Sequence, residues 1–179
     1  MTVASGTSTL HRVADAVRRE KQEYTQGEDR PVGSFLALTS VYGAAVAGLS
    51  ALVRARHVEL PERLSAADLA LVTVATHRLA RTLAKDPVTS PLRAPFTQFA
   101  GTSGEAELHE EVRHGGVRHA VGELLTCPFC LAQWVGTGFV FGLLLAPRAT
   151  RMVAGVFTIV AGADALQYAY AALQSTSGD

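Results

Sequence analysis

Charged residues are scarce in this chain of 179 amino acids. Asp, Glu, Lys and Arg together make up 18% of it, whereas ordinary soluble domains carry roughly 25%. The formal net charge is zero, which gives no reason to expect a nucleic-acid partner. Cysteine occurs only twice, too rarely for the disulfide framework of a small secreted protein. The composition therefore argues against both of these classes and directs attention to the uncharged stretches.

Three long segments have almost no charge. Residues 31–53 and 124–147 contain no Asp, Glu, Lys or Arg, and 152–179 contains only Asp164 and Asp179. A helix of about 20 apolar residues crosses the hydrocarbon core of a bilayer. A fourth helix is predicted from the capping signal Ser65-x-x-Asp68 to Asp86-Pro87. The sequence thus predicts an all-α fold, a four-helix transmembrane bundle with spans at about 33–53, 65–85, 127–146 and 152–172.

The remaining segments are expected outside the bilayer. Residues 1–30 form a predicted cytoplasmic N-terminal segment with an amphipathic helix at about 9–24, and 31–179 form the membrane domain. The loop 86–126, of about 40 residues, begins with three prolines that favour extended backbone. Residues 103–113 are predicted to be an acidic surface helix, 117–125 are predicted to be a further helix, and Thr126 is predicted to cap the third span. No strand is predicted.

The distribution of Lys and Arg predicts the orientation of the spans. Eleven of these residues fall in the N-terminal segment and the 77–126 region, and five fall in the other two connections. Positive residues accumulate on the cytoplasmic side. Both termini are therefore expected in the cytoplasm. The chain is rich in Arg and Ala and has two lysines, a composition that suggests a GC-rich bacterial genome. Together with the predicted spans, this makes the bacterial plasma membrane the expected location.

A polar cluster is predicted between the second and fourth spans. Four basic side chains share one face of the second, and Asp164 is the only charge in the fourth. Asp164 and Arg78 lie at similar depths, about 12 and 10 Å from the cytoplasmic end. A charge inside an apolar span normally has a partner, so Asp164 is expected to contact Arg78, Arg81 or His77. The pair either locks the two helices or serves a function. The candidate cluster is His77, Arg78, Arg81, Lys85, Asp86 and Asp164.

The two cysteines stand two residues apart, at Cys127 and Cys130. At the start of a helix and near arginines, such thiols favour a redox or metal-ligand role. A zinc or iron site would need further ligands, for which His109, His114 and His119 are upstream candidates. A packing role at the helix entry is preferred, and no cofactor is otherwise expected.

Two segments carry a resemblance to a known family. "THRLARTLAKDPVTSPLRAPF" (76–96) and "ELLTCPFCLAQWVG" (123–136) resemble the signatures of the bacterial family known as domain of unknown function 1360, over roughly 65–172. The resemblance implies a small multi-pass membrane protein without an assigned activity, and some family members are associated with sporulation. Residues 1–30 and 101–116 fall outside it. The matching positions are His77, Arg78, Arg81, Asp86, Pro87, Arg93, Pro95, Glu123, Cys127, Pro128, Cys130 and Trp134.

No nucleotide-binding loop, Ser-His-Asp arrangement or pair of catalytic carboxylates is found in the sequence, so a non-enzymatic role is favoured. The expected role is that of a membrane anchor or accessory subunit of an assembly. Its expected partners are the bilayer, anionic lipid headgroups and other proteins or a second copy. One alternative is a thiol-redox or metal-binding membrane protein that uses Cys127 and Cys130. A second alternative is a small channel or transporter that uses Asp164 with His77.

Overall fold

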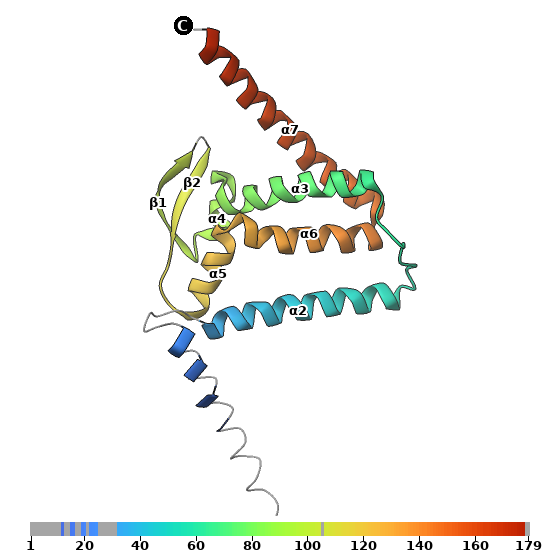
Figure 1. Cartoon of the computed structure of the whole chain (residues 1–179), viewed down its shortest axis with the longest axis vertical. Coiled ribbons are helices and arrows are strands. Elements are labelled where there is room, and N and C mark those ends of the chain that lie inside the picture. The colour runs from blue at the N-terminus through green and yellow to red at the C-terminus, as the bar shows by residue number, and fades with distance from the viewer. Residues whose placement is uncertain are drawn as a thin grey trace, which may run out of the picture.

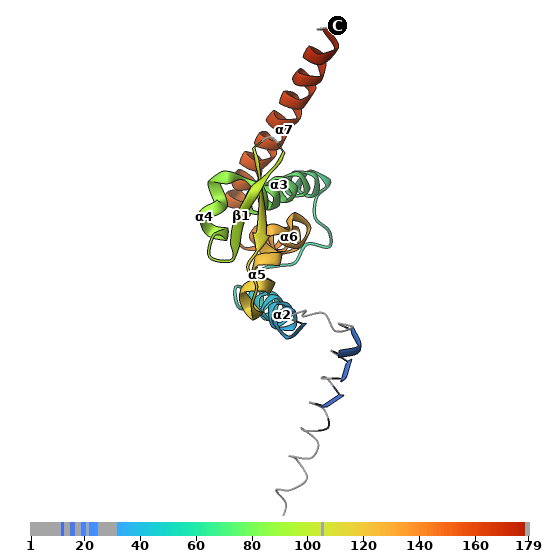
Figure 2. The same ribbon diagram turned by 90° about the vertical axis from the view of Figure 1, so that its left-hand side faces the viewer.

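The chain is mostly helical and contains one small sheet. The computed structural model describes residues 12, 15–16, 19–20, 22–24, 32–104 and 106–177, and 78% of it is helix. In the predicted amphipathic helix at about 9–24, the described residues 12, 15–16, 19–20 and 22–24 are helical and exposed, and the other residues lie outside the described part of the chain. Figure 1 shows three helices side by side, with a fourth that crosses one of them and extends away from the bundle, as Figure 2 also shows. These are α2 (Val32–Ala55), α3 (Ala66–Lys85), α6 (Pro128–Leu145) and α7 (Pro147–Ser177).

Three of these helices are long and apolar enough to cross a membrane: Val32–Ala55, Pro128–Leu145 and Pro147–Thr176. They correspond to the first, third and fourth predicted spans, although the last is longer than predicted. Large apolar side chains on α2 and α7 face outward, for example Leu36 and Ile159, which are 66% and 73% exposed. Extended exposed apolar surface is typical of a membrane or protein interface.

Helix α3 packs against α6 and α7 and is not among the three membrane-length apolar helices. Its small or branched side chains Val72 and Ala75 pack with Phe139, Leu143 and Ala154 from α6 and α7. Farther along, Ala80 and Ala84 pack with Leu131. Alanines allow close approach of helix backbones, so α6 and α7 cover much of α3. As predicted, Ser65 caps this helix by accepting a hydrogen bond from the backbone N–H of Asp68, and Asp86 ends it.

The predicted loop 86–126 is folded, and its last part is a helix, as predicted for 117–125. It contains η1 (Pro87–Thr89), α4 (Ser90–Arg93), β1 (Thr97–Gly104), β2 (Glu107–Val112) and α5 (Gly116–Thr126). The prediction of extended backbone at the prolines is wrong for 87–93. Pro87 and Pro91 stand in the first turns of short helices, where the missing N–H is not needed.

The acidic segment forms an antiparallel hairpin, so the predictions of a surface helix at 103–113 and of an entirely helical chain are wrong. Thr97 pairs with Val112 at its base. Along β2, Leu108, Glu110 and Val112 are partly buried and His109 and Glu111 are exposed, the period of two that a strand requires. Val112 also packs against α5, because a Cβ added at Gly122 would meet its Cγ1 at 2.5 Å.

Candidate functional site

Two cavities lie toward the end of the bundle that carries the hairpin and α5. The charged cavity, of about 470 Å³, is formed by α3, α7 and the start of β2, and includes His77, Arg78, Arg81, Asp86 and Asp164 among its lining residues. The thiol cavity, of about 580 Å³, lies between α2, α5 and α6 and includes Cys127 and Cys130. The sequence predicted the cysteines beside the basic face, but the structure divides the two groups between separate cavities.

Arg78 joins two carboxylates in the charged cavity. Its Nη1 and Nη2 donate to Asp86 Oδ1 and Oδ2 at 3.5 and 3.1 Å. Its Nε lies 3.0 Å from Asp164 Oδ2, but without hydrogen-bond alignment, so the buried Nε has no hydrogen-bond partner. This second contact is an ion pair. The predicted contact between Asp164 and Arg78 is therefore present, and it links α7 to α3.

The other predicted members of the cluster are placed differently. Arg81 forms an ion pair with Glu107 of β2, which ties the hairpin to α3. His77 is exposed and lines the charged cavity. Lys85 is not part of the cavity wall as the described residues define it. Only Arg78 thus contacts Asp164 in an ion pair among the described basic residues.

The most buried charged side chain is that of Arg93, and its structural role was not predicted from the sequence. Arg93 is 0% exposed and forms an ion pair with Glu110 through its Nε. Its Nη1 donates to the carbonyl oxygen of Leu83 at 2.8 Å and to Thr89 Oγ1 at 2.6 Å, and its Nη2 donates to the carbonyl oxygen of Asp86 at 3.1 Å. A fully buried charge is tolerated when it is paired and hydrogen-bonded. Arg93 therefore connects the end of α3, α4 and the hairpin.

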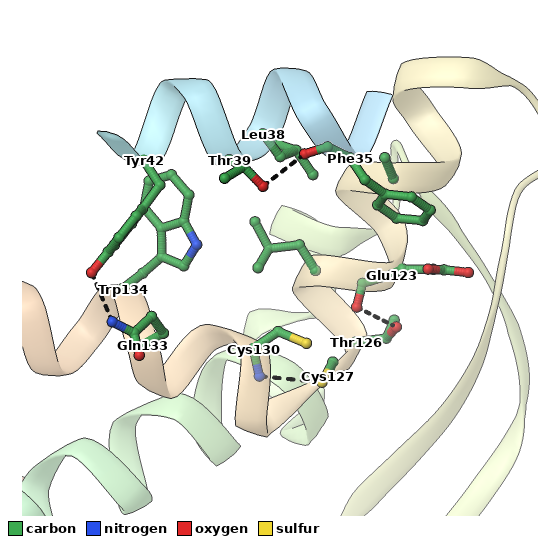
Figure 3. Close-up of a pocket in the computed structure, with 12 residues that line it drawn as sticks. Phe35, Leu38, Thr39, Tyr42, Glu123, Thr126, Cys127, Cys130, Gln133 and Trp134 are labelled. Carbon is green, nitrogen blue, oxygen red and sulfur yellow. Dashed lines mark hydrogen bonds between the residues drawn. The ribbon is translucent and has the colours of Figure 1, made fainter. Parts of the chain in front are cut away.

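The thiol cavity is shown in Figure 3. Glu123, Cys127, Cys130 and Trp134 follow one another at intervals of four, three and four residues, and all line it. This spacing keeps side chains on one helical face, although the chain passes from α5 to α6 between them. Phe35, Leu38, Thr39 and Tyr42 of α2 form the opposite wall. Glu123 is the only charged residue among the described residues of the lining.

Cys127 has a defined structural role. It is the N-cap of α6, and its Sγ accepts a hydrogen bond from the backbone N–H of Cys130 at 3.2 Å. The prediction of Thr126 as the cap is wrong, because Thr126 ends α5 and its hydroxyl donates to the carbonyl oxygen of Gly122. Pro128 occupies the first turn of α6, as predicted.

The cap gives a testable prediction. Replacing Cys127 with serine keeps a side-chain acceptor at the N-cap, so we expect nearly wild-type thermal stability. Replacing it with alanine removes the acceptor and is expected to cost about 1 kcal/mol. Both variants are compared by thermal unfolding in the same detergent, with Cys130→Ala as the matched control for removing a thiol. Equal losses for the serine and alanine variants would contradict a capping role.

A polar contact between α2 and α6 was also missed. Tyr42 Oη lies 2.8 Å from Thr137 Oγ1 and accepts a hydrogen bond from Gln133 Nε2 at 2.7 Å. The Tyr42 ring packs edge-on against Trp134, with ring centroids 5.1 Å apart. Such polar contacts hold helices together in lipid. The one sign of this contact in the sequence is that Tyr42 is the only tyrosine in the uncharged segment 31–53.

The predicted metal ligands do not converge in the described part of the chain, where no three His, Cys, Asp or Glu side chains form a group suited to a metal ion. His114 stacks on His119, with ring centroids 6.3 Å apart. His119 Nε2 lies 3.0 Å from Glu123 Oε1. Both cysteines are free.

Comparison with known proteins supports the resemblance stated above. The model of a family described as proteins of unknown function (DUF1360) matches residues 71–170, which is more than half of the chain. The sporulation protein YjcA of Bacillus subtilis (strain 168) is 30% identical over 86 residues, 46% of this chain and 73% of the relative. No solved structure matches. The chain therefore belongs to the DUF1360 family of proteins of unknown function.

Proposed function

We propose that the chain is a four-span protein of the bacterial plasma membrane that serves as an anchor or accessory subunit of a membrane assembly. One observation carries the proposal: three of the four charged side chains of α3, those of Asp68, Arg78 and Arg81, form ion pairs with side chains outside this helix. Asp68 accepts two hydrogen bonds from Arg151 at 2.7 and 2.8 Å at one end of α3. Arg78 and Arg81 pair with acids at the other end.

Pairing and shielding make it possible for a helix of mixed polarity to cross a bilayer. Because α6 and α7 cover α3 while α2 and α7 expose apolar side chains, the bundle suits lipid on its outer surface. The relative from Bacillus subtilis is named a sporulation protein, and this process is one in which such a subunit would act.

The topology follows from this proposal and is open to a direct test. In a background with Cys127→Ser and Cys130→Ser, we place single reporter cysteines by Glu59→Cys, in the α2–α3 connection, and by Glu111→Cys, on β2. With both termini in the cytoplasm, a membrane-impermeant thiol reagent is expected to label position 59 in intact cells and position 111 only after lysis. Labelling of both positions in intact cells, or the reverse pattern, would overturn this topology.

The assembly itself is tested by cross-linking in native membranes followed by purification. An accessory subunit should be recovered with a reproducible partner protein or with a second copy. Recovery as a single chain at every cross-linker length would count against the anchor proposal.

A thiol-based activity is the second proposal, favoured by one observation: two free cysteines line the same cavity. Metal analysis of the purified protein, with the Cys127→Ser variant as control, tests a zinc or iron site. Equal metal content in the two proteins would rule out a metal site at these cysteines. A transport role for the charged cavity, which His77 and Asp164 both line, is a third proposal. It predicts that Asp164→Asn abolishes ion flux in vesicles.

A further inference from the structure

We propose that the segment 87–93, formed by η1 and α4, lies on the membrane surface, with its outer side in the boundary between lipid headgroups and acyl chains. The inference rests on the proposed membrane insertion and deepens it, because it assigns a lipid contact to a segment outside the membrane-spanning helices. Its argument comes from the polarity of the segment, its depth and its place beside the bundle.

The polarity of segment 87–93 is the reverse of that of a surface helix in water. Its apolar side chains face outward, since Val88 is 79% exposed and Leu92 is 63% exposed. Its only charged residue, Arg93, is 0% exposed and donates a hydrogen bond to Thr89 Oγ1 at 2.6 Å. A surface helix in water turns its apolar side to the protein and its polar side outward. The outer side of this segment therefore suits an apolar surrounding.

The depth of the segment follows from α6. This helix has 18 residues, or about 27 Å, so all of it is needed to cross a hydrocarbon core of about 30 Å. Its first turn, where Phe129 is 90% exposed, must then lie at the edge of that core. Leu131 of α6 packs with Ala84, in the last turn of α3. The end of α3 therefore lies at the same edge, and η1 follows it directly.

Segment 87–93 stays at this depth and does not lead away from the membrane. From the end of α4, the Arg93 side chain donates hydrogen bonds to the carbonyl oxygens of Leu83 and Asp86, at 2.8 and 3.1 Å. Figure 2, which views the bundle from the end that carries the hairpin, places α4 beside α3 and α6. Lipid is the surrounding at this place, and interfacial helices bury their apolar side about 5–10 Å into such a boundary.

Labelling of single cysteines tests the proposal. Val88→Cys is introduced into the background with Cys127→Ser and Cys130→Ser. The full chain is then placed as single copies in phosphatidylcholine nanodiscs, both faces of which are open to a water-soluble maleimide. The remaining Leu92 should hold the segment in the boundary, because burial of one leucine favours that state by about tenfold or more. We therefore expect position 88 to react about tenfold more slowly than Glu111→Cys, on the exposed side of β2.

A second change shows whether the apolar side chain of the segment is responsible. Adding Leu92→Ser to Val88→Cys removes that side chain and should raise the labelling rate at position 88 by about tenfold, close to the rate at position 111. Phe99→Ser is the matched control. Phe99 is an apolar residue of β1 that is 70% exposed, and its replacement should leave the labelling rate at position 88 unchanged.

Three results would overturn the proposal. They are labelling of Val88→Cys in the nanodiscs as fast as at position 111, slow labelling that occurs only in native membranes and so indicates a protein partner, and a rate unchanged by Leu92→Ser. Ile159→Cys, at a position of α7 that is 73% exposed, should label slowly in every case in which the chain is inserted. Fast labelling at 159 would overturn the membrane insertion, whereas fast labelling at 88 alone overturns only this inference.

Discussion

Replacing Glu110 with glutamine is expected to destabilise the protein by about 3–5 kcal/mol, because it leaves the Arg93 cation buried without its counter-charge. Arg93 is 0% exposed and Glu110 is 6% exposed at the side chain, so water cannot replace the lost partner. The change also weakens the contact of Thr97 Oγ1 with the Glu110 carboxylate. Thermal unfolding in one detergent measures the loss. Proteolysis is expected to begin in the hairpin.

The neighbouring residue supplies the control. Glu111 lies on the exposed side of the same strand, and Glu111→Gln should change stability by less than about 0.5 kcal/mol. Replacing both partners, by Arg93→Met with Glu110→Leu, removes the buried charges together and should cost less than the sum of the two single changes. Equal behaviour of the glutamine variants at 110 and 111 would contradict the role assigned to this pair.

Replacing Arg78 with glutamine is expected to cost about 2 kcal/mol, more than Asp164→Asn. Arg78 donates hydrogen bonds to Asp86 and forms an ion pair with Asp164, so its loss leaves two acids without their shared cation. The side chain of Asp164 is 39% exposed, and its contact with Arg78 lacks hydrogen-bond alignment. Asp164→Asn should therefore cost about 0.5–1 kcal/mol.

A double-mutant cycle separates this pair from general effects of charge. The combined Arg78→Gln and Asp164→Asn changes should show a coupling of about 1 kcal/mol, because the two side chains touch. Arg151→Gln is the matched control, because Arg151 also joins α7 to α3 but does so through Asp68 at the other end. Its effect should add to that of Asp164→Asn. Additive effects of Arg78 and Asp164 would mean that the pair does not hold the helices together.

Part of this site was predictable because its signals are local or arise from a single strong constraint. The end of α3 at Asp86-Pro87 and its cap at Ser65 depend on residues next to one another in the chain. Asp164 needed a partner because a lone charge in an apolar helix is costly, and equal depth pointed to Arg78. The roles of the Arg93–Glu110 pair and of Tyr42 could not be predicted in this way. Packing between distant segments of the chain decides which partners these residues contact.

Residues 97–112 show why the hairpin was missed. Acidic residues at 107, 110 and 111 suggested a solvated helix, but Glu110 turns inward to Arg93 while Val112 packs on Gly122. These contacts outweigh the helix propensity of glutamate, because propensity is a weak prior that tertiary context overrides.

By itself, the sequence determined the three apolar helices, the boundaries of α3 and the need of Asp164 for a partner, since uncharged length, capping and the cost of a buried charge act along one segment. Only the tertiary structure decided that 97–112 is a hairpin, that α2 closes the thiol cavity, and that the cysteines and the basic face belong to separate cavities. Those outcomes depend on which distant side chains meet when α3 is covered by α6 and α7, and no local pattern encodes that choice.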